Sequence, residues 1–247
     1  MKQLMTVVLI SLFFSSNAIA KEPNWSEYAK VLQQVQPGEK HGVKLALVDY
    51  SALNQSGQLE KAYQSIKQFD VTLLQGQDEK LAFYINTYNI LALKMVVDHW
   101  PIKSIKEVGS FFSPVWGKQA GVIAGKGVSL DDIENDIIRP MADPRIHFAI
   151  VCASVSCPDL RNEPYSAAKL NTQLDEQVNV FLNNAKKGLL VINNELQGSK
   201  IFKWFAKDFK ATGGVEVFIR RYRTGIDKNI KIEDYLAYDW SVNGVEK

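Results

Sequence analysis

The segment from Asp78 to Asp98 constrains the fold of this 247-residue chain most, because it is apolar on nearly every helical face. A helix of this kind is buried on all sides, and it must stop before Trp100-Pro101 because the residue preceding a proline disfavours helical backbone. Asn86 and Asn89 lie on one face of this helix, where unpaired amides would cost about 1–3 kcal/mol each. They either pin the backbone of a crossing loop or orient a substrate or a histidine.

Shorter patterned segments surround this central helix. The pattern predicts helices over 24–34, 57–69, 129–139, 166–182 and 214–222, and strands over 43–50, 145–151 and 189–193. A small hairpin is expected to turn at Gly125-Lys126-Gly127. This mixture predicts an α+β fold in which the central buried helix packs on a small, mainly antiparallel sheet. No linker interrupts the chain, so we expect an N-terminal helical extension over 21–77 and one α+β domain over 78–247.

The first twenty residues have the pattern of a cleaved signal peptide. Lys2 is followed by an apolar stretch from Leu4 to Phe14, and Ala18-Ile19-Ala20 matches an A-x-A cleavage site. The stretch is too short to span a bilayer core of about 30 Å, so we expect no transmembrane anchor. The sequence therefore predicts a periplasmic or secreted protein, cleaved near Ala20. Export and a net charge of only +2 both argue against nucleic acid as a partner.

Cys152 and Cys157 are the only two cysteines of the chain. In an oxidising compartment two nearby thiols tend to pair, so we expect a disulfide between them. Their C-x4-C spacing differs from the C-x-x-C of thioredoxin-like enzymes, which disfavours redox exchange. A metal site is also disfavoured, because His147 and the two cysteines lack an evident fourth ligand at a familiar spacing. No cofactor is implied.

His147 begins an apolar segment that enters a loop containing both cysteines, Ser154 and Ser156. Strand alternation turns His147 away from Cys152, but His147 would meet Cys157 if the loop folded back. Two interpretations stay open. Either a disulfide holds a loop beside a positioned histidine, or Cys157 is a catalytic nucleophile with His147 as its base.

Two further segments carry charge whose role is open. Glu134 lies on the helix capped by Ser129, and it is either a solvated charge or the partner of an arginine or of His147. Between Lys200 and Lys231 there are nine basic and three acidic residues. This basic excess either faces solvent or faces an anionic polymer or phospholipid surface. The interleaved aromatic residues have helical spacing, which favours a core position for Trp204, Phe205, Phe209 and Phe218.

Four sequence blocks together resemble the domain-of-unknown-function 547 family: Phe83-Tyr84-Ile85-Asn86-Thr87-Tyr88-Asn89, Ser129-Leu130-Asp131-Asp132-Ile133-Glu134, the run from His147 to Pro158, and Lys200-Ile201-Phe202-Lys203-Trp204-Phe205. The resemblance covers roughly 78–222, with a weaker fifth block over 238–243. It implies a shared site containing Asn86, Asn89, Glu134, His147, Cys152, Ser154, Ser156 and Cys157. It implies no established reaction.

A central helix followed by a histidine-bearing strand is also similar to papain- and transglutaminase-like domains. Their nucleophilic cysteine opens the central helix, whereas this helix has none, so any such relation is to a degenerate or rewired site. We expect an exported envelope protein that binds a peptide-like or polymeric ligand in a cleft by the His147 loop. One alternative is a cysteine-dependent acyl transferase or amide hydrolase that uses Cys157 and His147, with Asn86 or Glu134 orienting the imidazole. Another is a structural partner of an envelope protein.

Overall fold

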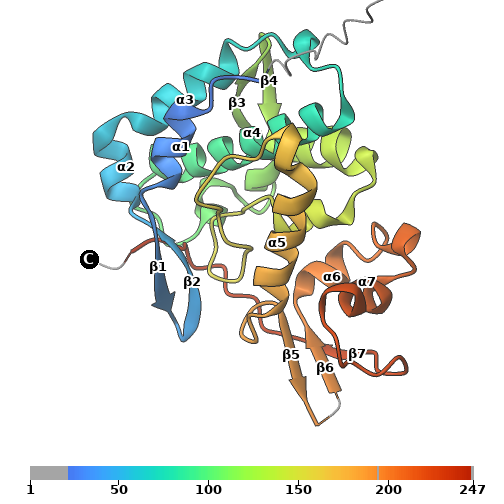
Figure 1. Cartoon of the computed structure of the whole chain (residues 1–247). Coiled ribbons are helices and arrows are strands. Elements are labelled where there is room, and N and C mark those ends of the chain that lie inside the picture. The colour runs from blue at the N-terminus through green and yellow to red at the C-terminus, as the bar shows by residue number, and fades with distance from the viewer. Residues whose placement is uncertain (1–21, 194, 246–247) are drawn as a thin grey trace, which may run out of the picture.

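The computed structural model of this chain describes residues 22–193 and 195–245 (Figure 1). The predicted signal peptide therefore lies outside the described residues. The α-helices are α1 (Ser26–Leu32), α2 (Tyr50–Ser56), α3 (Gln58–Lys67), α4 (Gln77–Asp98), α5 (Leu170–Leu182), α6 (Lys200–Trp204) and α7 (Val215–Tyr222). The strands are β1 (Val35–Lys40), β2 (Val43–Val48), β3 (Gln119–Ile123), β4 (Lys126–Ser129), β5 (Leu189–Ile192), β6 (Glu195–Gly198) and β7 (Ile232–Tyr235).

Helix α4 is the central buried helix that the sequence predicts. It begins where the Glu79 carboxylate accepts the backbone N–H groups of Gln75 and Gly76, at 2.7 and 3.1 Å. Most of its side chains are buried, and they form the middle of a large apolar cluster. At its end, His99 Nδ1 lies 2.8 Å from the carbonyl oxygen of Met95. The predicted bounds of 78–98 are thus confirmed to within one residue.

The strands form three small sheets, which confirms the predicted α+β class but divides the expected single sheet. Strands β1 and β2 pair antiparallel, as do β3 and β4, and the third sheet has the order β5-β6-β7. Only the β6–β7 pair is parallel. The β3–β4 hairpin turns at Ala124 and Gly125, both with positive φ, one residue before the predicted position. Because each sheet is small, helices and loops enclose most of the core.

The expected strand over 145–151 is wrong. Residues Pro144–Phe148 instead form a 3₁₀ helix, labelled η6, whose first turn is capped by the Asp143 carboxylate. The apolar run is therefore a buried irregular segment whose backbone hydrogen bonds go to local backbone groups and to the side chains of Asp143 and Asn89 instead of a neighbouring strand. This removes the strand on which the similarity to papain- and transglutaminase-like domains rests.

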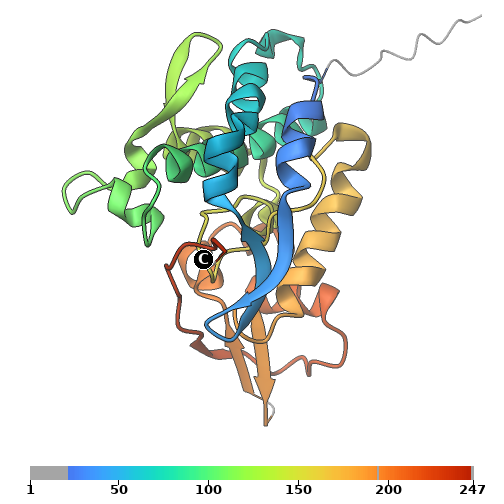
Figure 2. The ribbon, with the colours of Figure 1, turned by 90° about the vertical axis from the view of Figure 1, so that its left-hand side faces the viewer.

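Two large apolar cores fill most of the described structure, and a third, small cluster contains Val43, Leu45 and Val155. The first surrounds α4 and includes α1, α2 and α3, so residues from the predicted N-terminal extension share the core of the following domain. The second is rich in aromatic rings and centres on Phe148, Phe202, Phe209 and Phe218. In Figure 2, the gold helix α5 begins beside α1 and runs down toward the sheet that contains β5 and β6, which lies at the lower end of the molecule. None of the described helices is both long and apolar enough to cross a membrane.

Candidate functional site

Two asparagines of α4 hold both ends of the loop that carries the cysteines. The Asn89 amide donates to the carbonyl of Ala149 at 3.0 Å and accepts the N–H of Val151 at 2.8 Å. Asn86 makes the same pair of bonds with the backbone of Tyr165, at 2.8 and 2.9 Å. Both side chains are buried, at 2% and 0% exposure. The interpretation that they pin a crossing loop is confirmed, and neither lines the cavity described below.

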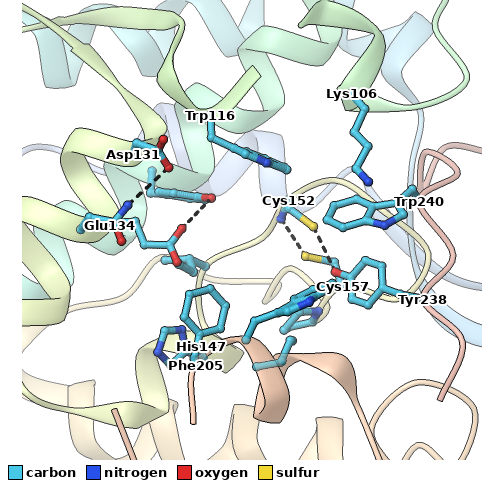
Figure 3. A pocket seen from close by; sticks show the side chains of 16 residues that line it. Lys106, Trp116, Asp131, Glu134, His147, Cys152, Cys157, Phe205, Tyr238 and Trp240 are labelled. Atoms are coloured by element: carbon cyan, nitrogen blue, oxygen red, sulfur yellow. Dashed lines mark hydrogen bonds between the residues drawn. The ribbon is translucent and has the colours of Figure 1, made fainter. Parts of the chain in front are cut away.

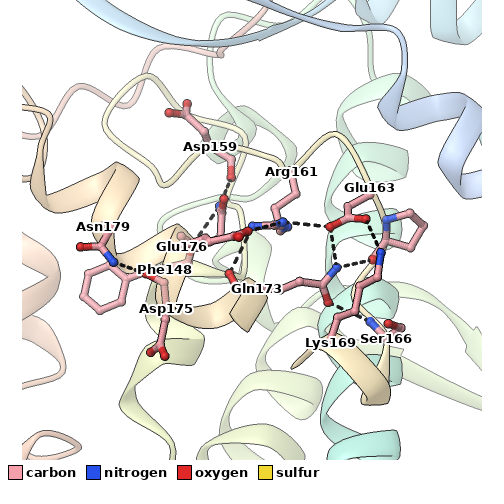
Figure 4. Close-up of polar contacts among 12 residues, drawn as sticks. Phe148, Asp159, Arg161, Glu163, Ser166, Lys169, Gln173, Asp175, Glu176 and Asn179 are labelled. Atoms are coloured by element: carbon pink, nitrogen blue, oxygen red, sulfur yellow. Dashed lines mark hydrogen bonds and ion pairs between the residues drawn. The ribbon is translucent and has the colours of Figure 1, made fainter. Parts of the chain in front are cut away.

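Helix α5 holds the same loop from the other side (Figure 4). Gln173 donates to the carbonyl of Pro164 at 2.9 Å and accepts the N–H of Ser166 at 3.0 Å. Arg161 forms an ion pair with Glu176 at 2.8 Å. Contacts from two helices leave the loop little freedom, which is the condition for a preorganised site.

Residues 238–243 complete the support of the loop. Ser156 donates its N–H to the carbonyl of Asp239 at 3.2 Å, while its hydroxyl accepts the Asp239 N–H at 2.8 Å. The N–H of Val155 donates to the carbonyl of Ser241 at 2.8 Å. Ser156 is buried and serves this pairing, so the structure places it in the support of the loop and outside the cavity wall.

A cavity of about 360 Å³ lies between the two cores, beside this loop (Figure 3). Its aromatic wall consists of Tyr88, Trp116, Trp204, Phe205, Tyr238 and Trp240. Its polar side chains include Lys106, Asp131, Glu134, His147, Cys152 and Cys157. The structure thus brings together four of the predicted site residues, Glu134, His147 and both cysteines, and leaves Asn86, Asn89, Ser154 and Ser156 outside the cavity wall.

Both cysteines are free thiols in the structure, so the predicted disulfide is not formed in it. The N–H of Cys152 points at Cys157 Sγ, at 2.7 Å. Cys152 Sγ lies 3.1 Å from the hydroxyl of Ser154 and 3.3 Å from that of Tyr238. Ser154 is buried, and its hydroxyl is in direct hydrogen-bond contact with the Cys152 thiol.

These contacts shift the pKa values of the two thiols in opposite directions. Burial raises the pKa of Cys152, but hydrogen bonds with Cys157, Ser154 and Tyr238 outweigh it and lower that pKa to about 7. Burial raises the pKa of the Cys157 thiol well above its usual range, and its proximity to Cys152 raises it further. A thiolate is the reactive form of cysteine, so Cys152 is the activated thiol. The sequence-based alternative used Cys157 as the nucleophile, whereas these contacts favour the thiolate at Cys152.

His147 is buried and bound to a carboxylate that sequence reasoning did not connect to it. Its Nε2 lies 2.8 Å from Asp208, whose other contacts come from Arg139 at 2.7 and 2.9 Å. Its ring stacks on Phe205 with 4.0 Å between ring centroids. Burial lowers the pKa of His147 even though Asp208 opposes that shift. Among the described residues, no hydrogen bond joins His147 to Cys157, so the predicted nucleophile–base pair is not formed.

Two carboxyl groups face the cavity from the helix capped by Ser129. Residues Asp132–Ile138 of this helix form a π-helix, η4, a rare form that often occurs at functional sites. Burial raises the pKa of Glu134 to about 7, although Arg139 and a hydrogen bond from Tyr88 at 3.3 Å oppose this. Burial and nearby carboxylates also raise the pKa of Asp131. Glu134 therefore pairs with neither an arginine nor His147, because Arg139 and His147 both bind Asp208.

Several cavity residues were not predicted as site residues. Asp208 appears in the sequence only as one of three acids in a basic stretch, and Trp204 and Phe205 were assigned to the core with Phe209 and Phe218. That core prediction is confirmed for Phe209 and Phe218, which are buried. For these unpredicted cavity residues, the sequence signal was the weak fifth block 238–243, which contains Tyr238 and Trp240. Within the described residues, no group of three or more His, Cys, Asp or Glu could hold a metal ion.

Residues 71–182 match a family model described as "Protein of unknown function, DUF547". This range contains α4, η4 and the loop with both cysteines, whereas Asp208, Tyr238 and Trp240 lie beyond it. The comparisons with curated proteins and with solved structures found no match. Over residues 71–182 the family match confirms the resemblance to the DUF547 family seen in the sequence blocks.

Proposed function

We propose that this chain is an exported envelope protein that binds a peptide-like or polymeric ligand in the cavity beside His147. The observation that carries this proposal is the composition of the cavity wall, which combines six aromatic rings with convergent polar groups. Small-ligand sites have this composition, because apolar walls supply contact area and the polar groups fix orientation. The pattern of a signal peptide supports the location.

The aromatic wall contains a cluster of three rings that suits a flat group or a chain segment. Tyr238, Trp240 and Trp204 all contact one another, with centroids 4.5, 4.8 and 5.7 Å apart. Trp204 keeps 45% of its surface exposed, which is unusual for so large an apolar ring. Rigid rings bind flat groups and chain segments at a small cost in side-chain entropy. A ligand held against this cluster would lie beside Cys152, whose Sγ is 3.3 Å from the Tyr238 hydroxyl.

Two probes test the binding proposal: purified peptidoglycan as a polymer, measured by co-sedimentation, and a pool of short peptides, measured by tryptophan fluorescence. We expect binding of at least one probe, weakened at least tenfold by Trp204→Ala because the aromatic cluster loses its exposed ring. Val191→Ala on β5, an exposed apolar residue outside the cavity wall, is the matched control and should bind normally. Equal binding by the parent and the Trp204 variant, or no binding of either probe, would contradict the proposal.

The acidity of Cys152 favours a second candidate function, cysteine-dependent acyl transfer or amide hydrolysis. In this reaction the Cys152 thiolate attacks the acyl carbon, a C–S bond forms, and the C–N bond breaks. The leaving amine takes its proton from Glu134, whose pKa of about 7 leaves it partly protonated at neutral pH. Water or a second amine then releases the acyl group from the thioester. Here Cys152 replaces Cys157 as nucleophile, and Glu134 replaces His147 in proton transfer.

Alkylation with iodoacetamide tests this second candidate. We expect the rate of Cys152 labelling to rise with pH through a midpoint near 7, about one to two units below an ordinary thiol. Cys157→Ser should keep rapid labelling, and Cys152→Ser should lose it. Labelling that begins only after a reductant is added, with a mass two hydrogens lower beforehand, would support the predicted disulfide and reject thiol catalysis.

A further inference from the structure

Two adjacent phenylalanines are the most exposed large apolar residues of the described structure. Phe111 is 93% exposed and Phe112 is 94% exposed, and their rings contact each other edge to face at 5.3 Å. Both lie on the loop between the 3₁₀ helices Ile105–Val108 and Val115–Gly117. This loop projects from the body of the molecule, as the green segment of Figure 2 shows. Two rings fully exposed to water do not stabilise the fold, so they indicate a surface that contacts another molecule.

The backbone of this loop is fixed by its own hydrogen bonds. Ser110 and Ser113 exchange backbone N–H···O bonds of 2.9 and 3.3 Å, and the Ser110 hydroxyl also accepts the Ser113 N–H at 3.1 Å. Gly109 has no room for a side chain, because an added Cβ would lie 2.4 Å from the backbone nitrogen of Val115. The rings are therefore presented on a closed, tight turn, so little ordering entropy remains to be lost when they bind.

The charge near the turn indicates what it contacts. Residues 101–118 contain three lysines, Lys103, Lys106 and Lys118, and one acid, Glu107, which is a net charge of +2. Aromatic rings flanked by lysines are typical of segments that rest on anionic lipid, where the rings enter the headgroup region and the lysines meet the lipid phosphates. A protein partner would also bind the two rings, but its binding would not require the positive charge around them.

The same segment forms one side of the cavity. Lys106 lies 3.6 Å from the ring centroid of Trp240, and Trp116 follows the turn by four residues. Both side chains line the cavity and flank it on one side in Figure 3. A surface bound by the Phe111–Phe112 turn therefore lies next to the cavity.

We propose that the Phe111–Phe112 turn inserts into the headgroup region of a bilayer containing anionic phospholipid. The contact is peripheral: two rings enter the lipid, and the lysines around them bind phosphate. It places the cavity at the membrane surface, within reach of ligands attached to that surface. The proposal does not depend on what the cavity binds.

Vesicle sedimentation tests this proposal, using the chain from Lys21 onward, which contains every described residue. We expect it to sediment with vesicles of phosphatidylglycerol mixed with phosphatidylcholine and much less with phosphatidylcholine alone. Phe111→Ser with Phe112→Ser should weaken partitioning at least tenfold, because the turn loses both of the rings that enter the lipid. Lys103→Gln and Lys118→Gln should each weaken it by about fivefold and reduce its dependence on salt.

A matched control uses the other exposed apolar pair, Val191 and Ile192 on β5, which are 41% and 51% exposed. Changing both to serine should leave vesicle binding unchanged. Because the Phe111–Phe112 turn contributes nothing to either core, its serine variant should unfold at the same denaturant concentration as the parent. The proposal fails if the parent does not bind anionic vesicles, or if changing the control pair to serine weakens binding as much as changing the phenylalanine pair.

Discussion

Asn89 of α4 is fully buried and Glu134 at the cavity wall is partly buried, and the two differ in how their hydrogen bonds are satisfied. Asn89 makes two bonds with backbone groups of the loop, at 2.8 and 3.0 Å. Glu134 has one hydrogen bond, from Tyr88 at 3.3 Å, among the described residues, and its pKa is raised to about 7. Complete pairing stabilises a fold, whereas incomplete pairing costs stability and leaves a group free to act on a ligand.

The largest expected effect comes from Asn89→Leu. Leucine has a similar size but leaves the carbonyl of Ala149 and the N–H of Val151 buried without partners, so we expect a loss of about 2–5 kcal/mol in the free energy of unfolding. Urea denaturation measures this loss. Asn135→Ala is the control, because Asn135 is exposed, and it should change stability by less than about 0.5 kcal/mol. A silent Asn89 variant would break the comparison.

Glu134→Gln should change stability in the opposite direction. The pKa of Glu134 is raised in the folded state, so the folded protein binds more protons than the unfolded chain between about pH 4.5 and 7. Stability therefore falls as pH rises through that window, and above it the ionised carboxylate destabilises the folded state. We expect the glutamine variant to be more stable by about 1–3 kcal/mol at pH 8 and unchanged at pH 4.

The pH dependence separates this effect from ordinary repacking. Asp136→Asn removes an exposed charge from the same helix and should shift stability by less than about 0.5 kcal/mol at either pH. Equal stability of the Glu134 variant and the parent at pH 8 would mean that Glu134 is as well satisfied as Asn89, and the contrast between the two regions would disappear.

The smallest effect concerns two serines that each precede a helical segment. Ser129 Oγ accepts the Asp132 N–H at 3.0 Å, and the Asp132 carboxylate accepts the Ser129 N–H at 2.7 Å. Ser166 occupies the corresponding position before Ala167–Lys169 but makes no such side-chain bond. Ser129→Ala should therefore cost about 1 kcal/mol, and Ser166→Ala less than about 0.5 kcal/mol, in thermal or urea unfolding. Similar losses for both would show that the cap bonds contribute nothing specific.

The features predicted correctly from the sequence are those encoded by neighbouring residues. The length and burial of α4, the cap at Ser129 and the hairpin before it depend on patterns within a few positions. The segment 145–151 was misread because a short apolar run has the same pattern in a strand and in a buried irregular segment. Its hydrogen-bond partner Asn89 is about 60 residues away.

The site was predicted in part for the same reason. Glu134, His147 and the two cysteines are unusual residue types in apolar surroundings, so they can be recognised from the sequence alone. The pairing of His147 with Asp208 joins positions 61 residues apart, and the acidity of Cys152 depends on Tyr238, 86 residues away. A single sequence contains no signal for such pairs. The choice between Cys152 and Cys157 could therefore be made only from the three-dimensional contacts.

The pairing of the cysteine loop with residues 238–243 has a consequence for the order in which the protein assembles. Closing a chain segment of this length is entropically costly, so such contacts form late in folding. A chain synthesised from its N-terminus contains α4 and the cysteines well before Tyr238 and Trp240 are added. We expect the thiol of Cys152 to stay ordinary during that interval and to gain its acidity only when the closing segment docks, so that the most reactive group of the site is the last to form.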